Sequence, residues 1–488
     1  MQSKHSVLLI FTVIVSLLLS ACQASPSKNV ITSKNDGAFD TNAIVSAEET
    51  HAQDATQAIQ HYEKFSSTDK TVEISINLDT SVSGADMPVV EVEPHYLTES
   101  EVKNAAYSLF GSADFYEWKY YTDEVLCKSE IQEKLNRWSQ FTSQDAVDRL
   151  YGWHSEDTVR IVKSFIDEYT KKLESAPDNS MQIPCQWTFK KAPYYLLSAS
   201  EAATMNSSNE SDMLRATVSV NGIPFVFRAE TRNLDDYKVN YISANIESDS
   251  PDDIDRVYFT AQLCRTEKPS DEQVAAVKSK AEAVLKQLQL GQWQIDDCYV
   301  ETTTLDTAVE YSVYVTAIPV LEGVATISQQ SIANLNDPNV YASNYQMPHV
   351  QFRYSAQGEL VSFLLESPID STKVINSNVK AMTMDELMEK AKVFFELSTF
   401  SKYDKDNRLS GAETDVQCVL SVNDVKYSLA RIRVPNTDAS YYYVPALTIF
   451  GNAEFKNIAT GETYFSNEDL LLLTLNAVDG TVINTTNT

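Results

Sequence analysis

The chain has 488 residues and a formal net charge of −29, with 68 acidic side chains against 39 basic ones. This acidity argues against nucleic-acid binding, which needs a basic surface to meet the phosphates, and against a body that lies flat on anionic lipid. The hydrophobic content of 43% favours packed domains over general disorder, and the length predicts two or three of them.

The first 22 residues have the pattern of a secretory signal. Lys4 supplies a positive charge, and residues 7–19 form an apolar run that is too short to span a membrane. The run ends in Leu19-Ser20-Ala21-Cys22. This ending resembles the lipobox of bacterial lipoproteins. The resemblance implies that residues 1–21 are a lipoprotein signal peptide and that Cys22 carries a diacylglyceryl anchor. We therefore expect a cell-membrane lipoprotein on the extracytoplasmic face, because two acyl chains give stable attachment.

The next part of the chain predicts a tether and then a domain of helices followed by strands. Residues 22–70 hold the lipidated Cys and a stretch rich in Ser, Thr, Asn, Ala and Gln, which is typical of a flexible tether. Thr98 and Glu101 form a capping box that begins a helix. Further on, Asn221-Gly222 lies between two alternating runs and predicts a hairpin. The strands expected in this domain are 72–78, 214–220, 223–229, 237–246 and 257–263.

The same order of helix and then strands begins again twice. Ser270 with Gln273, and Thr383 with Glu386, form capping boxes, and each precedes an apolar stripe at helical spacing. Strands are expected after the first helix at 297–303, 309–318, 350–354 and 360–365, and after the second at 416–422, 425–434 (around Asn423-Asp424), 441–450, 470–478 and 481–484.

Helices segregated from runs of strands predict an α+β fold rather than a parallel α/β sheet. The repeated order predicts duplicated helix-plus-antiparallel-sheet units. We expect an N-terminal α+β domain at 71–255, a middle α+β unit at 256–370 and a C-terminal α+β unit at 371–488, with the last two related closely enough to superpose.

A second resemblance concerns the end of the chain. Leu473 to Ile483 reads as an apolar strand, an Asp-Gly turn and a short return strand. This ending resembles PepSY and YycH-like envelope modules, and together with the lipobox and tether it resembles uncharacterised lipoproteins of clostridial-type Gram-positive bacteria. The resemblance implies a unit that binds or regulates rather than catalyses, and no site residue carries over from it.

Residues suited to catalysis are scarce. Of six histidines, His95, His154 and His349 lie in the predicted folded part. The sequence has no His-Glu-x-x-His, no Gly-x-Ser-x-Gly, no P-loop and no Gly-x-Gly-x-x-Gly motif. We expect a non-enzymatic binding, scaffold or regulatory module without a cofactor. One alternative is an envelope hydrolase whose site residues lie far apart in sequence. Another is a solute-binding receptor, although its alternating strand–helix pattern is missing.

An acidic loop near residue 404 is a weak candidate for Ca²⁺. It begins like an EF-hand, but Arg408 and Leu409 stand where a ligand and a glycine are required. A solvated loop is the simpler interpretation, and we expect no metal. The candidate ligands are Asp404, Asp406, Asn407 and Glu413.

Tyr441, Tyr442 and Tyr443 form the candidate partner surface. Consecutive strand residues face opposite sides, so one or two of the three should be exposed. Pro445 favours an edge strand, where an envelope protein, a peptide or a glycan could dock. The cysteines other than Cys22 are five in number and widely spaced, so we expect no disulfide to be required for folding.

Overall fold

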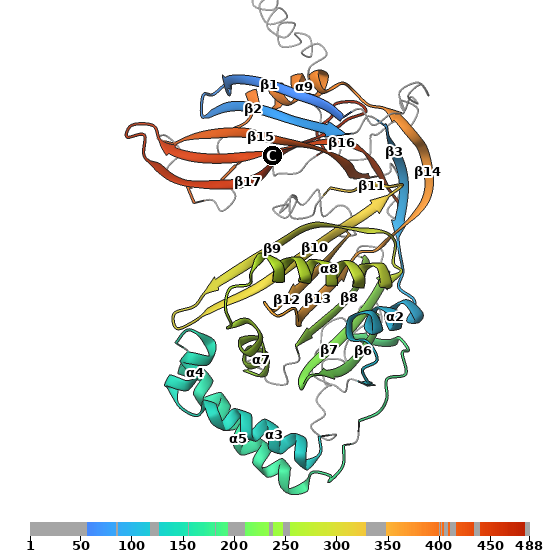
Figure 1. Ribbon diagram of the computed structural model, residues 1–488, viewed down its shortest axis with the longest axis vertical. Helices are drawn as coiled ribbons and strands as arrows, with labels where there is room; N and C mark the ends of the chain where they lie inside the picture. The colour runs from blue at the N-terminus through green and yellow to red at the C-terminus, as the bar shows by residue number, and fades with distance from the viewer. Residues whose placement is uncertain are drawn as a thin grey trace, which may run out of the picture. The chain divides into compact units, whose positions relative to one another are not determined.

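The computed structural model of the protein describes residues 56–83, 86–117, 126–154, 156–180, 182–193, 210–233, 238–246, 254–327, 348–399, 401, 403–404, 408–409, 416–433 and 440–483. Contacts divide the chain into two compact units (Figure 1). We call them the terminal unit, which takes its described residues from Met1–Met87, Asn378–Ile432 and Val444–Thr488, and the central unit, from Pro88–Ser377 and Arg433–Tyr443.

Both units combine helices with sheets, so the predicted α+β class is confirmed. In the terminal unit, β1 (Thr56–Ser66) and β2 (Val72–Ser83) form an antiparallel hairpin. α9 (Met384–Glu396) begins at the predicted capping box of Thr383 and Glu386. Its buried side chains share one core with the strands. The remaining strands are β15 (Val416–Arg433), β16 (Tyr441–Asn457), which begins in the central unit, and β17 (Thr463–Asn476).

The terminal unit differs from the sequence-based prediction in three ways. Residues 56–66, assigned to the tether, form β1. β15 runs through Asn423-Asp424 without a turn, and neither residue has the positive φ that a two-residue hairpin turn needs. β2 pairs with β15 in parallel, so the sheet is not wholly antiparallel. This last pairing joins segments 346 residues apart, as in Val72 and Cys418, and brings both ends of the described chain into one core.

The central unit is built on a sheet that, within the described residues, has ten strands in the order β11-β10-β12-β13-β8-β7-β6-β4, with β5 beside β6 and β9 beside β10. The strands are β4 (Phe115–Glu117), β5 (Lys190–Pro193), β6 (Glu210–Val220), β7 (Ile223–Asn233), β8 (Lys238–Ile246), β9 (Trp293–Thr304), β10 (Val309–Leu321), β11 (Val324–Ala325), β12 (His349–Tyr354) and β13 (Leu360–Glu366).

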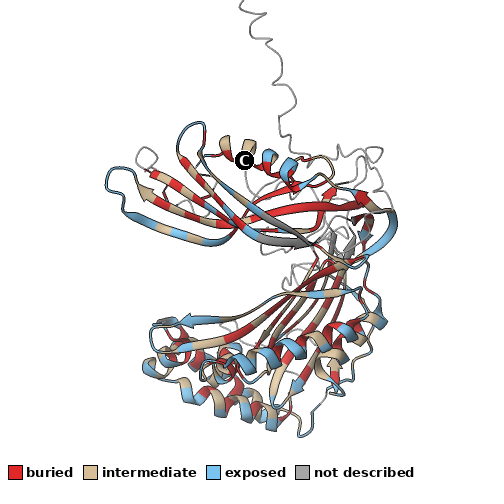
Figure 2. Ribbon diagram, turned by 45° about the horizontal axis from the view of Figure 1, so that its top comes forward, coloured by how far each residue is buried: buried red, intermediate tan, exposed pale blue. Residues whose placement is uncertain are grey.

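One face of this sheet carries the core. α8 (Asp271–Leu288) lies across the strands (Figure 1), and its Val277, Ala281 and Leu285 are buried against them. Along the strands, buried residues alternate with less buried ones (Figure 2), as a sheet with one packed face requires. The core residues of the strands include Ala216, Phe227, Ala244, Phe363, Phe352 and Val315.

The remaining elements surround this sheet or connect to it. α2 (Glu99–Phe110) begins at the predicted capping box of Thr98 and Glu101. A small helical bundle has its own core around Trp138. The bundle comprises α3 (Lys128–Trp138), the short η4 (Ser139–Phe141), α4 (Gln144–Tyr151) and α5 (Glu156–Ser175), with α7 (Ile254–Cys264) beside it. The central unit also contains residues 88–94 of β3 (Asp86–Pro94) and residues 369–377 of β14 (Ile369–Lys380).

Two further predictions for this region need correction. Residues 257–263, expected to be a strand, lie in α7, where Phe259 and Leu263 are buried at helical spacing. The predicted division at residue 255 also differs from the observed one, since β8 pairs with β13 and the two predicted units share one sheet. The hairpin at Asn221-Gly222 is confirmed, with φ of 54° and 79° at these residues.

The cysteines and the hydropathy of the helices complete this description. Cys127, Cys185, Cys264, Cys298 and Cys418 are free thiols. Cys264 and Cys418 are buried, and Cys298 is half-buried. In the part of the chain that the structure describes, no helix is long and apolar enough to cross a membrane.

Candidate functional site

A pocket of about 470 Å³ lies in the central unit, where three separate segments meet. The first is the turn between α8 and β9, the second is the hairpin between β10 and β11, and the third is the start of β14. The lining residues are Leu290, Gly291, Gln292, Trp293, Pro319, Val320, Leu321, Glu322, Gly323, Ile369, Asp370 and Ser371.

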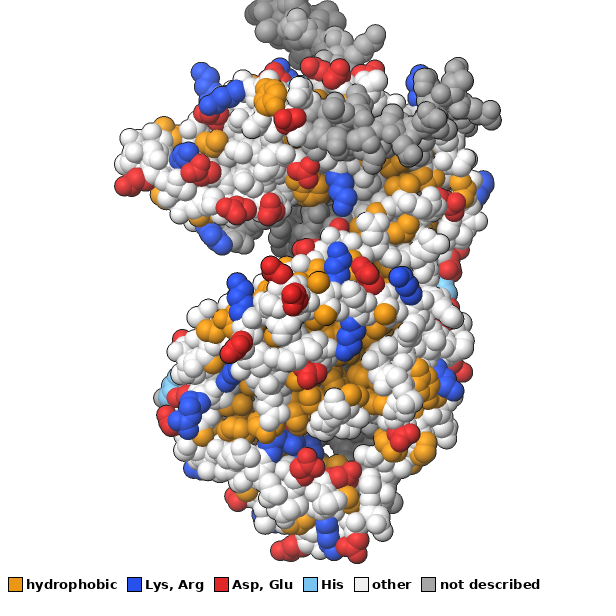
Figure 3. All heavy atoms as spheres, viewed as in Figure 1, with side chains coloured by type: hydrophobic (Ala, Val, Ile, Leu, Met, Phe, Trp, Pro, Cys, Tyr) orange, Lys and Arg blue, Asp and Glu red, His pale blue; other side chains and the backbone are white. Residues whose placement is uncertain are grey.

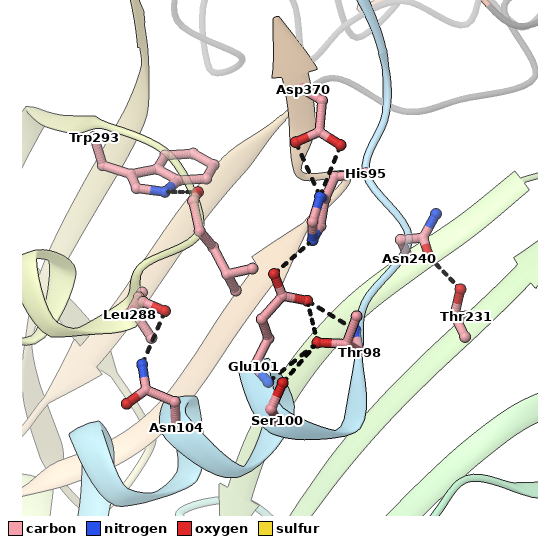
Figure 4. Close-up of polar contacts among 11 residues, drawn as sticks. His95, Thr98, Ser100, Glu101, Asn104, Thr231, Asn240, Leu288, Trp293 and Asp370 are labelled. Atoms are coloured by element: carbon pink, nitrogen blue, oxygen red, sulfur yellow. Dashed lines mark hydrogen bonds and ion pairs between the residues drawn. The ribbon is translucent and has the colours of Figure 1, made fainter.

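The apolar wall of the pocket is positioned by hydrogen bonds near the end of α8. The Trp293 indole Nε1 donates to the Leu290 carbonyl at 2.8 Å. Asn104 of α2 donates to the Gln287 carbonyl at 2.6 Å and to the Leu288 carbonyl at 3.1 Å (Figure 4). These bonds hold the end of α8 in place. Because hydrogen bonds within the chain fix these groups, the wall is preorganised.

The opposite rim is a tight turn. Glu322 and Gly323 have φ of 49° and 82° and connect β10 to β11 in two residues. A positive φ is uncommon for a glutamate, and backbone of this kind costs about 1 kcal/mol or more. The turn exposes the Glu322 side chain at the pocket rim.

Behind Asp370, His95 lies between two carboxylates (Figure 4). Its Nδ1 is 3.0 and 2.9 Å from the two Asp370 carboxylate oxygens. Its Nε2 forms an ion pair with Glu101 at 3.1 Å. Glu101 is itself fixed, because its carboxylate accepts from the Thr98 backbone N–H at 2.8 Å and from the Thr98 hydroxyl at 2.7 Å.

These contacts set the charges of the cluster. Burial lowers the pKa of His95, but hydrogen bonds and charges from Asp370 and Glu101 outweigh it, so the pKa of His95 is raised above its ordinary value. Burial raises the pKa of Glu101, but Thr98 and His95 together hold it below its usual range. The cluster therefore favours an imidazolium between two carboxylates. A histidine held in this way is a poor general base, because its Nδ1 is bonded to Asp370 and the charge of Glu101 beside Nε2 stabilises the protonated form.

The other two histidines lie elsewhere in the central unit. His154 follows α4, and its Nδ1 is 2.8 Å from an Asp148 carboxylate oxygen in an exposed position. His349 begins β12, with Nδ1 3.5 Å from Glu366. The three histidines lie on separate elements and have different carboxylate partners.

The expected exposure of the tyrosine triplet is wrong. Tyr441, Tyr442 and Tyr443 are 3%, 9% and 0% exposed. β16 lies between β15 and β3 in the strand order, so it is not an edge strand. Pro445 is tolerated there because it falls after Tyr443, the last residue paired with β3, and before Ala446, the first residue paired with β17. The predicted partner surface required exposed rings, and these rings are buried.

Of the four candidate Ca²⁺ ligands, the structure describes Asp404. It is 6% exposed, and its carboxylate accepts from the backbone N–H groups of Arg408 and Leu409 at 3.0 and 2.9 Å. Its oxygens thus stabilise a turn. Asp406, Asn407, Glu413 and the lipidation candidate Cys22 lie outside the described residues. Within the described ranges, no group of three or more His, Cys, Asp or Glu side chains is arranged to hold a metal ion.

Sequence reasoning missed Trp293, Glu322 and Asp370. Trp293 was visible as an aromatic residue just after Gly291, and Glu322-Gly323 as a short turn between apolar residues. Asp370 gave no local signal, because its role depends on His95, which lies 275 residues earlier.

Comparisons with known proteins add little. No protein-family model matches the chain, and no curated protein matches it. Among solved structures, it is similar to an uncharacterised protein from Eubacterium rectale, with 10% sequence identity, a TM-score of 0.35, and coverage of 87% of this chain and 93% of that one. A likeness at this level carries no functional argument.

Proposed function

We propose that the protein is a lipid-anchored extracytoplasmic protein whose central unit is a non-enzymatic binding or regulatory module of the cell envelope. The pocket beside Trp293 is its docking recess, and the occupant is a basic side chain of an envelope protein or peptide. The anchor rests on the lipobox resemblance at Cys22.

The observation that carries the proposal is the state of His95. It contacts Asp370, which lines the pocket, and both its ring nitrogens face carboxylates. A hydrolase that uses histidine as its base needs a ring nitrogen free to reach a nucleophile or a water. Here the imidazole instead connects the start of β14 to α2, and so positions one side of the pocket.

The lining chemistry supports a cationic occupant. Trp293 is half-buried and supplies apolar surface to the lining, whereas Leu290 and Leu321 are buried. The Asp370 side chain is 59% exposed, and Glu322 is exposed at the rim. A lysine or arginine suits such a recess, because its stem packs on apolar surface while its charge meets the carboxylates. Elsewhere, acidic and basic side chains are interspersed over the face that carries α8 (Figure 3).

Site-specific crosslinking tests the docking recess. A photo-reactive residue at position 322 should capture a partner in intact cells, whereas the same residue at Lys286, on the exposed side of α8, should not. The double variant Glu322→Gln/Asp370→Asn should reduce the captured amount when the probe is placed at Gln292. Equal capture from positions 322 and 286, or no effect of the double variant, would show that the pocket is not the docking site.

One observation favours the alternative of an envelope hydrolase. The His154–Asp148 pair has the geometry in which a carboxylate orients a catalytic imidazole. Purified protein should nevertheless show no turnover of peptide, ester or glycan libraries. Turnover that disappears in the His154→Ala or His349→Ala variant would overturn the non-enzymatic proposal.

The anchor has a separate test. Cys22→Ser should leave the protein unprocessed or released from the membrane, because the diacyl group has no other attachment point. Metabolic labelling with a palmitate analogue and membrane fractionation measure this. A variant that is processed at the same position and stays membrane-bound would contradict the lipid anchor.

A further inference from the structure

The face of the ten-stranded sheet turned away from α8 carries a row of polar side chains. The strand registers place Arg215 opposite Arg228, Arg228 opposite Ser243, and Ser243 opposite Leu364. Gln351 and Thr316 continue the row across β12 and β10. Each neighbour along its strand (Ala216, Phe227, Ala244, Phe363, Phe352 and Val315) belongs to the core, so the row lies on the opposite face.

The two arginines are an unfavourable pair by themselves. Directly opposite residues on antiparallel strands have Cβ atoms about 5 Å apart, and like charges in this arrangement destabilise a sheet. The chain as a whole is acidic, with a net charge of −29, so positive charge gathered on one spot is unusual for it. The ion pair of Arg228 with Glu230 relieves part of this repulsion, and an arrangement that works against stability is expected where side chains serve binding.

Arg228 is fixed in position rather than free to move away. It forms an ion pair with Glu230, and its guanidinium lies 5.1 Å from the centre of the Tyr241 ring. The Tyr241 hydroxyl donates to the same Glu230 carboxylate at 2.8 Å. Glu230 is fully buried, whereas the Arg228 side chain keeps 27% of its surface exposed. The guanidinium is therefore oriented by buried groups and still accessible.

Polar groups on this face also lack partners. Within the described part of the chain, the Nε of Arg228 and the Oγ1 of Thr316 are buried and make no hydrogen bond. Thr316 is 6% exposed. A buried donor without an acceptor costs about 1–3 kcal/mol.

We propose that Arg215 and Arg228 hold the oxyanion of a small ligand, a carboxylate or a phosphate group. Guanidinium groups form two parallel hydrogen bonds to such oxygens, and two of them on neighbouring strands clamp one anion from two sides. Glu230 and Tyr241 are positioning residues. The site is separate from the pocket beside Trp293, and the inference goes beyond the function proposed there.

Calorimetric titration of the purified full-length chain with citrate and with inorganic phosphate tests this site. At least one of the two should bind, and the affinity should fall with added salt. Arg215→Gln should weaken binding about tenfold or more, because it removes charge-assisted hydrogen bonds. The tighter of the two probes identifies the chemical class of the ligand.

Two further variants make the result decisive. Arg160→Gln removes the same charge from α5, where Arg160 pairs with Asp157 at the surface, and should leave binding unchanged. Arg215→Lys keeps the positive charge but loses the forked geometry of the guanidinium, so this variant should bind the probes weakly. It provides the test if Arg215→Gln does not fold. The proposal is overturned if neither probe binds at millimolar concentration, or if Arg215→Lys and Arg160→Gln both bind as the wild type does. Neither outcome affects the crosslinking test at position 322.

Discussion

Two charge clusters in the central unit have opposite composition. In the first, the Asp255 carboxylate accepts from Arg137 Nε at 2.8 Å, from Arg137 Nη2 at 3.1 Å and from the Trp138 indole at 2.8 Å, and Lys134 lies 3.4 Å away. One anion thus has two cations around it. In the second cluster, one imidazolium, that of His95, has two carboxylates around it. Each of the two clusters connects segments that are far apart in the sequence.

The clusters differ in depth. The Asp255 side chain is 3% exposed, and its basic partners are 11% and 13% exposed. In the His95 cluster, the imidazole is 19% exposed and Asp370 is 59% exposed. Burial raises the pKa of Asp255, but Arg137, Lys134 and Trp138 outweigh it and hold the pKa of Asp255 below its usual range.

This difference separates the roles of the two clusters. A buried charge that loses its partners stays in a low-dielectric environment, so the Asp255 cluster is needed for the packing of the bundle on α7. Charges near water are screened and interact weakly. The His95 cluster therefore contributes little to stability, but its contribution depends on pH and salt, and it borders the pocket.

The largest effect is expected for Asp255→Ala. It leaves Arg137 and Lys134 without their anion and Trp138 without its acceptor, and should cost about 3–5 kcal/mol of unfolding free energy. The urea midpoint of the central unit measures this. The matched control is Asp157→Ala, whose side chain is 82% exposed and which should change stability by less than about 0.5 kcal/mol. Similar losses of unfolding free energy in both variants would show that burial does not determine how much a charged side chain contributes to stability.

Trp138→Phe tests how much the hydrogen bond from the indole contributes to the Asp255 cluster. The ring still fills the bundle core, while the Nε1 donor to Asp255 is lost. We expect a loss of about 1–3 kcal/mol, smaller than that of Asp255→Ala, in the same urea experiment. A loss equal to that of Asp255→Ala would mean that packing around the indole, rather than the carboxylate, dominates.

The third effect is a pH dependence. The pKa of His95 is higher in the folded than in the unfolded state, so its stabilisation is complete below the unfolded value of about 6.5 and is lost as pH rises through the folded value. Stability of the wild type should therefore fall from near pH 6.5 upward, and His95→Gln should fall less. Thermal melts from pH 6 to 9 check this. Parallel curves for the two proteins would contradict the charged state assigned to His95.

The smallest effect is expected for Asp370→Asn. Its side chain is largely exposed, so the loss at pH 6 should be below about 1 kcal/mol and should shrink with added salt. The more sensitive readout is the pKa of His95, which should decrease because one of its two anions is gone. NMR titration of the imidazole measures it. An unchanged pKa would show that Glu101 alone holds the imidazolium.

Features encoded over a few residues were predicted from the sequence. The capping boxes at Thr98, Ser270 and Thr383 begin helices at the expected residues, because the contacts join residues three apart. Asn221-Gly222 forms its turn because both residues adopt a positive φ readily. These local signals, with the segregation of helices from strands, were enough for the α+β class.

Features that depend on distant partners were not predicted. Residues 257–263 are rich in residues that favour strands, yet packing against the bundle and the sheet places them in a helix. The tyrosine triplet is buried because β16 has neighbours on both sides. The partner surface assigned to these rings was inferred from strand alternation. Alternation predicts which face of the sheet a side chain is on, but it does not predict whether other elements cover that face.

The sequence by itself determined the scarcity of catalytic residues, the signal-like start, and the ends of several helices. The tertiary structure alone decided that β2 joins β15, that β8 joins β13, and that three segments form the pocket. The physical reason is the range of the forces involved. Capping and turn preferences act within about four residues. Distant strands pair where the pairing buries the apolar faces of both strands away from water. Which pairings do so depends on the whole chain.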